Sequence, residues 1–102
     1  MERAAVIGAG AWGTTLARHL AEKGMPVTLW AYEPEVADGI RTKHENLLFL
    51  PGIPLPPSLH ATGSLAEAVH GVDLLIFAVP SHAARSVLGE LSPFLQRAIP
   101  IV

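Results

Sequence analysis

Ala4-Ala5-Val6-Ile7-Gly8-Ala9-Gly10-Ala11-Trp12-Gly13, residues 4–13, is the stretch that decides the fold. Its first four residues form a continuous apolar run, which is typical of a parallel strand covered on both faces. Three glycines follow directly with the spacing G-x-G-x-x-G. From residue 13 onward, small and apolar residues recur at the spacing of one helix face, which predicts a helix ending near residue 23. The stretch therefore predicts a strand, a glycine turn and a helix in succession.

The rest of the chain continues this alternation of strands and helices. The predicted strands are 27–32, 60–62 and 72–79, with another beginning at 100, and the predicted helices are 35–43, 64–71 and 82–91. Pro34 fits a first helical turn, Ser64 opens a capping box with Glu67, and Ser81 is a candidate N-cap. We therefore predict an α/β domain with a doubly wound parallel sheet. Residues 1–102 form one domain in this prediction, truncated at the start of the fifth strand.

The segment 46–57 is the one long stretch that fits neither element type. Four prolines and a glycine forbid a regular helix or strand there. Six leucine, isoleucine and phenylalanine residues are interleaved with them, which is too many for a solvated linker. We expect an ordered loop that packs against the domain.

Composition excludes several classes of function. Seven Lys and Arg against nine Asp and Glu give a net charge of −2, so the basic footprint of a nucleic-acid-binding protein is absent. No apolar run approaches the roughly 18 residues of a membrane span, and the first residues lack the pattern of a signal peptide. Cysteine is absent and the five histidines lack metal-ligand spacing, so we expect a cytoplasmic protein without a metal site.

The glycine turn is the first candidate binding site. At this spacing Gly8 permits the tight turn, Gly10 lets the backbone approach a pyrophosphate, and Gly13 packs the helix on the strand. The helix N-terminus then offers N–H groups and a positive dipole end to phosphates, with Ala9, Ala11 and Trp12 in the same turn. The pattern favours a dinucleotide, although a glycine turn that binds nothing remains the alternative.

The end of the second strand is the second candidate site. Glu33 stands 20 residues after Gly13, where a carboxylate accepts hydrogen bonds from ribose hydroxyls and repels a 2′-phosphate. This residue favours NAD as the cofactor, with NADP possible, and the alternative is a solvated glutamate at a helix start. Tyr32 is placed to stack on adenine or to be a surface tyrosine, and Trp12 either reaches the cofactor or packs internally.

Two residues after the fourth predicted strand are further candidates for a role in the site. His82 follows the carboxyl end of this strand, where ligands bind in doubly wound sheets, so a role in the site stays open. Ser81 lacks the G-x-S-x-G surroundings of a nucleophile and fits a helix cap better.

Four stretches together resemble the amino-terminal domain of NAD(P)-dependent glycerol-3-phosphate dehydrogenase. They are Gly8 to Ala17 with its tryptophan, Val27-Thr28-Leu29-Trp30, the loop from Asn46 to Pro56, and Ala78-Val79-Pro80-Ser81-His82. These stretches lie in the family order and cover nearly the whole chain. The proline-rich loop is the feature that is most specific to this family.

The resemblance implies a Rossmann-type cofactor domain and a reaction. The family transfers hydride between the nicotinamide and dihydroxyacetone phosphate, giving sn-glycerol 3-phosphate for phospholipid synthesis, and its complete enzymes form homodimers. By resemblance, residues 8–13 hold the pyrophosphate, Tyr32 and Glu33 lie at the adenosine, and Phe49, Val79, Pro80 and Ser81 border the cofactor cleft.

The same resemblance implies that the catalytic residues lie outside these 102 residues. The family's catalytic lysine and substrate-phosphate groups belong to a second, helical domain that is absent here, and neither Lys23 nor Lys43 matches them. No catalytic residue is assigned. A dinucleotide-binding sensor or regulatory module without catalysis is the alternative function, and a ketopantoate-type reductase is a further alternative that the loop at 46–56 argues against.

Overall fold

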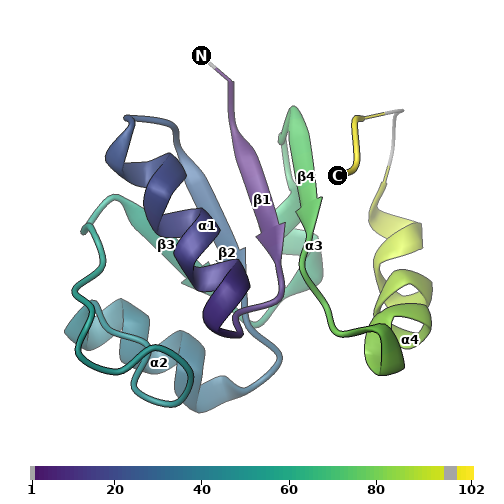
Figure 1. Cartoon of the computed structure of the whole chain (residues 1–102). Coiled ribbons are helices and arrows are strands. Elements are labelled where there is room, and N and C mark those ends of the chain that lie inside the picture. Colours follow the sequence, from purple (N-terminus) through teal and green to yellow (C-terminus); the bar gives the residue numbers. More distant parts are fainter. Residues whose placement is uncertain (1, 96–98) are drawn as a thin grey trace.

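The architecture is a four-stranded parallel sheet with helices on both faces, in a computed structural model that describes residues 2–95 and 99–102 (Figure 1). The strands are β1 (Ala4–Ile7), β2 (Val27–Trp30), β3 (Leu59–Thr62) and β4 (Leu74–Phe77), in the order β3-β2-β1-β4. The helices are α1 (Ala11–Glu22), α2 (Pro34–Lys43), α3 (Leu65–Val69) and α4 (Ser81–Leu91), with a 3-10 turn η1 (Ser92–Phe94). This confirms the doubly wound Rossmann-type fold.

The sheet separates two hydrophobic cores, because neighbouring residues of a strand point to opposite faces. In β1, Ala4 and Val6 face the core under α1 and α2, whereas Ala5 and Ile7 face the core under α3 and α4. All four β1 residues are fully buried. The continuous apolar run in the sequence thus reflects a central strand covered on both sides.

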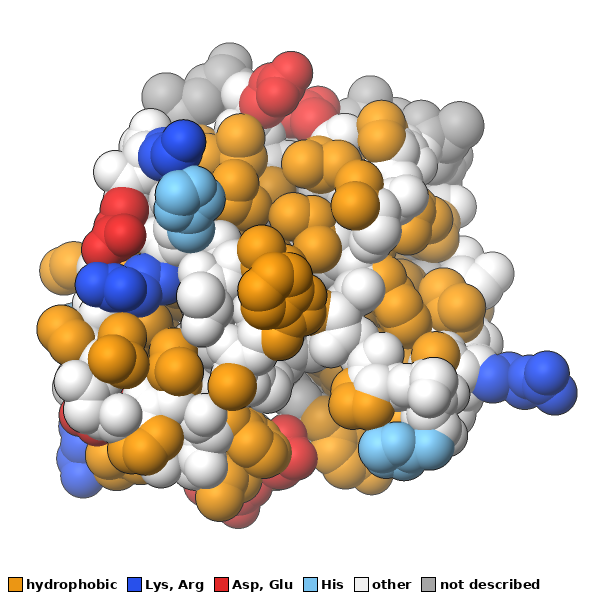
Figure 2. Space-filling model, viewed as in Figure 1, with side chains coloured by type: hydrophobic (Ala, Val, Ile, Leu, Met, Phe, Trp, Pro, Cys, Tyr) orange, Lys and Arg blue, Asp and Glu red, His pale blue; other side chains and the backbone are white. Residues whose placement is uncertain are grey.

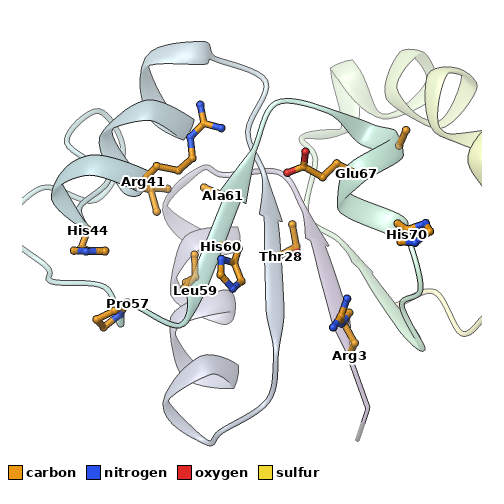
Figure 3. A pocket seen from close by; sticks show the side chains of 12 residues that line it. Arg3, Thr28, Arg41, His44, Pro57, Leu59, His60, Ala61, Glu67 and His70 are labelled. Carbon is orange, nitrogen blue, oxygen red and sulfur yellow. The ribbon is translucent and has the colours of Figure 1, made fainter.

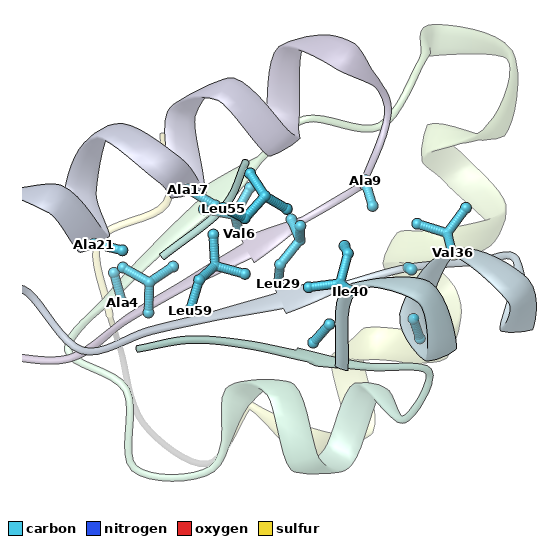
Figure 4. Close-up of a cluster of buried hydrophobic side chains, with 14 residues drawn as sticks. Ala4, Val6, Ala9, Ala17, Ala21, Leu29, Val36, Ile40, Leu55 and Leu59 are labelled. Carbon is cyan, nitrogen blue, oxygen red and sulfur yellow. The ribbon is translucent and has the colours of Figure 1, made fainter. Parts of the chain in front are cut away.

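The loop between α2 and β3 packs into the first core, as predicted. Leu55 is 4% exposed and lies with Val6, Leu29 and Leu59 among the side chains that α1 and α2 cover (Figure 4). Its backbone N–H donates to the carbonyl of His44 at 2.8 Å, which returns the loop to the end of α2. The prolines therefore replace a regular element without leaving the segment unpacked.

Residues 100–102 lie beside the edge strand β4, on the side away from β1. Ile101 pairs in parallel with Leu75, whose N–H donates to the carbonyl of Pro100 at 3.0 Å. Val102 accepts from Phe77 and donates to Leu75. A further strand was predicted to begin at residue 100; in the structure, residues 100–102 make a single parallel bridge to β4 and are not a strand of the sheet.

Two helix starts differ from the sequence prediction. The helix α1 begins at Ala11 rather than residue 13, because Gly10 is already its N-cap. Ser81 is the first residue of α4 and not its cap, since Pro80 occupies the N-cap position without a side-chain bond. By contrast, the Ser64 hydroxyl accepts from the Glu67 N–H at 3.1 Å, so the predicted cap of α3 is confirmed.

Candidate functional site

A cleft of about 540 Å³ opens at the carboxyl ends of β1, β2 and β4, where doubly wound sheets bind their ligands. The turn after β1, the segment after β2 and the segment after β4 each form a wall. The α4 helix closes one side with His82, Ser86 and Glu90, which are spaced four residues apart and therefore lie on one helix face. Of these three, only His82 was a candidate from the sequence.

The cleft brings together most of the residues that the sequence analysis assigned to cofactor binding. Its lining includes Gly8, Ala9, Gly10, Tyr32, Glu33, Phe49, Val79 and Pro80. Ala11, Trp12, Gly13 and Ser81 are not part of this lining. Ligand binding by these residues stays a prediction.

The three motif glycines have different structural reasons to be glycine. Gly8 has a φ of +118°, and a Cβ there would lie 2.6 Å from the Ala78 carbonyl oxygen. A Cβ on Gly13 would overlap the Gly8 carbonyl. Gly10 has an ordinary φ of −70°, and a Cβ there would meet nothing within 4 Å. Packing therefore requires glycine at 8 and 13, whereas a Cβ at 10 would extend into open space.

The start of α1 is suited to an anionic group. Gly10 caps the helix without a side-chain hydrogen bond, and the first turn carries no acidic residue. Such a helix start leaves backbone N–H groups and a positive dipole end unneutralised. The space over Gly10 is open beside this helix start, and pyrophosphate binding here stays a prediction.

The segment after β2 places an aromatic ring and a carboxylate at the cleft mouth. Tyr32 is 73% exposed and its ring packs edge-on against Trp30, with ring centroids 6.2 Å apart. Trp30 is itself fixed, because its indole N–H donates to the Gly63 carbonyl at 3.1 Å. Glu33 is the N-cap of α2 but makes no side-chain capping bond, so its carboxylate is not used at the helix start.

The indole of Trp12 faces solvent rather than the core. It is 68% exposed, so the alternative of an internal packing tryptophan is wrong. Leu47 and Leu48 of the loop are also more than half exposed, and Phe49 is 37% exposed. Figure 2 shows hydrophobic side chains in the middle of the face that carries α1, with charged side chains mostly at its margin.

Asn46 is a buried residue of the site that the sequence analysis did not single out. Its side chain is fully buried, and its amide nitrogen donates to the Ala9 carbonyl at 2.8 Å and to the Thr14 hydroxyl at 2.9 Å. Its amide oxygen accepts from the Phe49 N–H at 3.1 Å. One side chain thus joins the glycine turn to the proline-rich loop. The signal in the sequence was the place of Asn46 as the first residue of the loop that carries the family resemblance.

A second hollow, of about 650 Å³, lies away from the glycine turn and contains none of the predicted site residues. Thr28 and His60 pair on neighbouring strands at its floor, with Arg3 and His70 at one side and Arg41 at the other (Figure 3). Arg41 is bound to Asp38 at 2.6 Å.

Neither a metal-ligand cluster nor a membrane-spanning helix is found in residues 2–95 and 99–102. Within these ranges no three His, Cys, Asp or Glu side chains gather as metal ligands would. No helix of this described part has the length and apolarity to cross a membrane.

Comparison with known proteins gives matches along nearly the whole chain. Residues 3–102 match the family described as NAD-dependent glycerol-3-phosphate dehydrogenase N-terminus. A relative named glycerol-3-phosphate dehydrogenase [NAD(P)+] from Geobacter sulfurreducens is 52% identical over 101 residues, which are 99% of this chain and 30% of that protein. The chain thus spans about a third of this curated relative.

Solved structures also match this chain along nearly its whole length. A glycerol-3-phosphate dehydrogenase from Coxiella burnetii matches with a TM-score of 0.92 and 36% identity over 98% of this chain and 31% of that one. A PanE/ApbA family ketopantoate reductase from Ralstonia eutropha matches with a TM-score of 0.78 over 97% of this chain and 32% of that one. Its identity is 24%, so this second likeness concerns the fold alone.

Proposed function

The chain belongs to the family of NAD-dependent glycerol-3-phosphate dehydrogenase amino-terminal regions, and from this premise we propose that residues 1–102 bind the nicotinamide dinucleotide of such an enzyme. The family membership decides against the ketopantoate-type alternative. The observation that carries the proposal is the cleft at Gly10, which is open where the motif needs space and is flanked by an uncapped helix start.

Each wall of the cleft has a role in this proposal. The α1 start and residues 8–13 hold the pyrophosphate through backbone N–H groups. Tyr32 and Glu33 face the adenosine, and Phe49 and residues 79–81 border the remaining part. When bound, the dinucleotide supplies the hydride for reduction of a carbonyl. The described residues position it, and none of them is proposed to act as the catalytic acid or base.

The whole-protein function follows from the family and is part of the proposal. The complete enzyme interconverts dihydroxyacetone phosphate and sn-glycerol 3-phosphate, with the product used in phospholipid synthesis. It is cytoplasmic and homodimeric in this proposal. The preference for NAD over NADP rests on Glu33, because a carboxylate accepts from a ribose hydroxyl but repels a 2′-phosphate.

A chimeric enzyme tests the proposal directly. Residues 1–102 replace the matching 30% of the Geobacter sulfurreducens relative, and oxidation of NADH by dihydroxyacetone phosphate is followed by absorbance. Turnover within about tenfold of the parent enzyme supports the proposal. A folded chimera that binds NADH without turnover would favour a sensor or regulatory module, and one that binds no dinucleotide would contradict the proposal.

A further inference from the structure

The buried Asn46 side chain makes three hydrogen bonds, which connect the glycine turn, the start of α1 and the proline-rich loop. Both of its N–H donors and its carbonyl acceptor are used, and all three partners belong to the glycine turn, the first turns of α1 or the loop. A buried amide with every contact made is held in one orientation, because leaving any of these groups unpaired costs free energy.

The bond to Ala9 fixes the peptide between Ala9 and Gly10. The Ala9 carbonyl points to Asn46, which lies in the interior. In a trans peptide the C=O and N–H point in opposite directions. The Gly10 N–H therefore points away from the interior, and Gly10 lines the cleft. This N–H has no hydrogen-bond partner among the described residues.

The bond from the Phe49 N–H to Asn46 fixes the loop segment that contributes Phe49 to the lining of the same cleft. The Phe49 N–H donates to the side-chain oxygen of Asn46 at 3.1 Å. The Leu50 N–H donates to the backbone carbonyl of Asn46 at 2.9 Å. These two bonds hold a turn that sets Phe49 at the cleft lining. The Asn46 side chain thus joins the glycine turn to the segment that carries Phe49, 40 residues after Ala9 in the sequence.

We propose that Asn46 is a positioning residue for dinucleotide binding, which aims the Gly10 N–H at the pyrophosphate and sets Phe49 against the bound cofactor. Asn46 itself does not touch the ligand. This inference rests on the proposed function of the cleft. In this inference, Asn46 affects binding by orienting the backbone of the glycine turn and not by contacting the ligand.

The test compares two variants that each remove buried hydrogen bonds from this cluster. Asn46→Leu has a similar size and loses all three side-chain bonds. Thr14→Val is the matched control, because it removes the Asn46–Thr14 bond but leaves the bonds to Ala9 and Phe49 in place. Affinity for NADH is measured by calorimetry on the 102-residue chain, at a temperature where circular dichroism shows each variant to be folded.

We expect Asn46→Leu to weaken NADH binding by at least about tenfold, the factor for losing one hydrogen bond to a charged group. Thr14→Val should stay within about threefold of the unaltered chain. A similar loss in both variants, or no loss in Asn46→Leu, would overturn the inference, because binding would then follow stability alone.

A second measurement without ligand separates this inference from the proposed function. In the NMR spectrum, Asn46→Leu should shift the Ala9 carbonyl carbon and the Gly10 amide, whereas Thr14→Val should leave both near their original positions. Unchanged signals in Asn46→Leu would overturn the positioning role even if NADH binds. Absence of NADH binding by the unaltered chain would contradict the proposed function, and these shifts would still decide whether Asn46 orients the peptide.

Discussion

At the scale of single residues, Gly10 is the position where a substitution should weaken dinucleotide binding far more than it lowers the free energy of unfolding. Its backbone is extended and its Cβ direction is empty, so a larger side chain has room without any shift of the fold. We expect Gly10→Val to abolish dinucleotide binding and to lower the free energy of unfolding by only about 1 kcal/mol, because valine is a poorer N-cap than glycine. Calorimetry with NADH and thermal unfolding of the same sample measure both.

Gly8→Ala is the control that should behave in the opposite way. At a φ of +118° and 2.6 Å from the Ala78 carbonyl, an added Cβ strains the backbone and pushes on β4. The cost should be about 2 kcal/mol or more. If Gly10→Val retained its affinity for NADH, the space over Gly10 would not be the pyrophosphate site.

Glu33 decides the expected cofactor preference. Its carboxylate caps nothing at the start of α2, so it is available to a ribose hydroxyl. We expect NADH to bind more tightly than NADPH by about 1–3 kcal/mol, the range for a badly matched charged partner. Glu33→Gln should narrow this difference, because it removes the repulsion of a 2′-phosphate. Parallel titrations with both cofactors test this, and equal affinities for the unaltered chain would mean that Glu33 faces solvent.

At the scale of elements, the apolar runs and the glycine spacing predicted the strands and the order of helices. The reason is local, since a strand buried on both faces is apolar at every position and the turn requires glycine at 8 and 13. The predicted first residues of the helices differed from the observed ones by up to two positions, because the residue that takes the N-cap position depends on the turn before it. Asn46 was not predicted, since its partners at 9 and 14 become neighbours only through the fold.

Leu55, near the end of the proline-rich loop, is its buried apolar side chain. We expect Leu55→Ala to lower the free energy of unfolding by about 2–5 kcal/mol, as for other large-to-small core substitutions. Leu47→Ala is the matched control, because Leu47 is 55% exposed and should change stability by less than about 0.5 kcal/mol. Urea denaturation of the two variants gives the comparison, and equal effects would mean that the loop does not depend on its core contact.

At the scale of the whole molecule, the described residues line a cleft that is proposed to bind a cofactor, and no catalytic group is assigned to it. We expect the 102-residue chain to bind NADH but to leave its absorbance unchanged when dihydroxyacetone phosphate is added, because the proposed catalytic groups belong to the part of the relatives that this chain does not span. Measurable reduction of the substrate by the pure chain would contradict this and would require a catalytic residue within 1–102.

The two tryptophans of the chain lie in opposite surroundings. Trp30 is 5% exposed and bonded to Gly63, whereas Trp12 is 68% exposed beside the glycine turn. Their fluorescence should therefore separate into a blue-shifted component from the core and a red-shifted component that iodide quenches. The red-shifted component reports the solvent exposure of the turn. The blue-shifted component reports unfolding and, because Trp30 lines the cleft, should also lose intensity by energy transfer when a reduced nicotinamide binds there. Iodide quenching distinguishes the two indoles in one unlabelled sample.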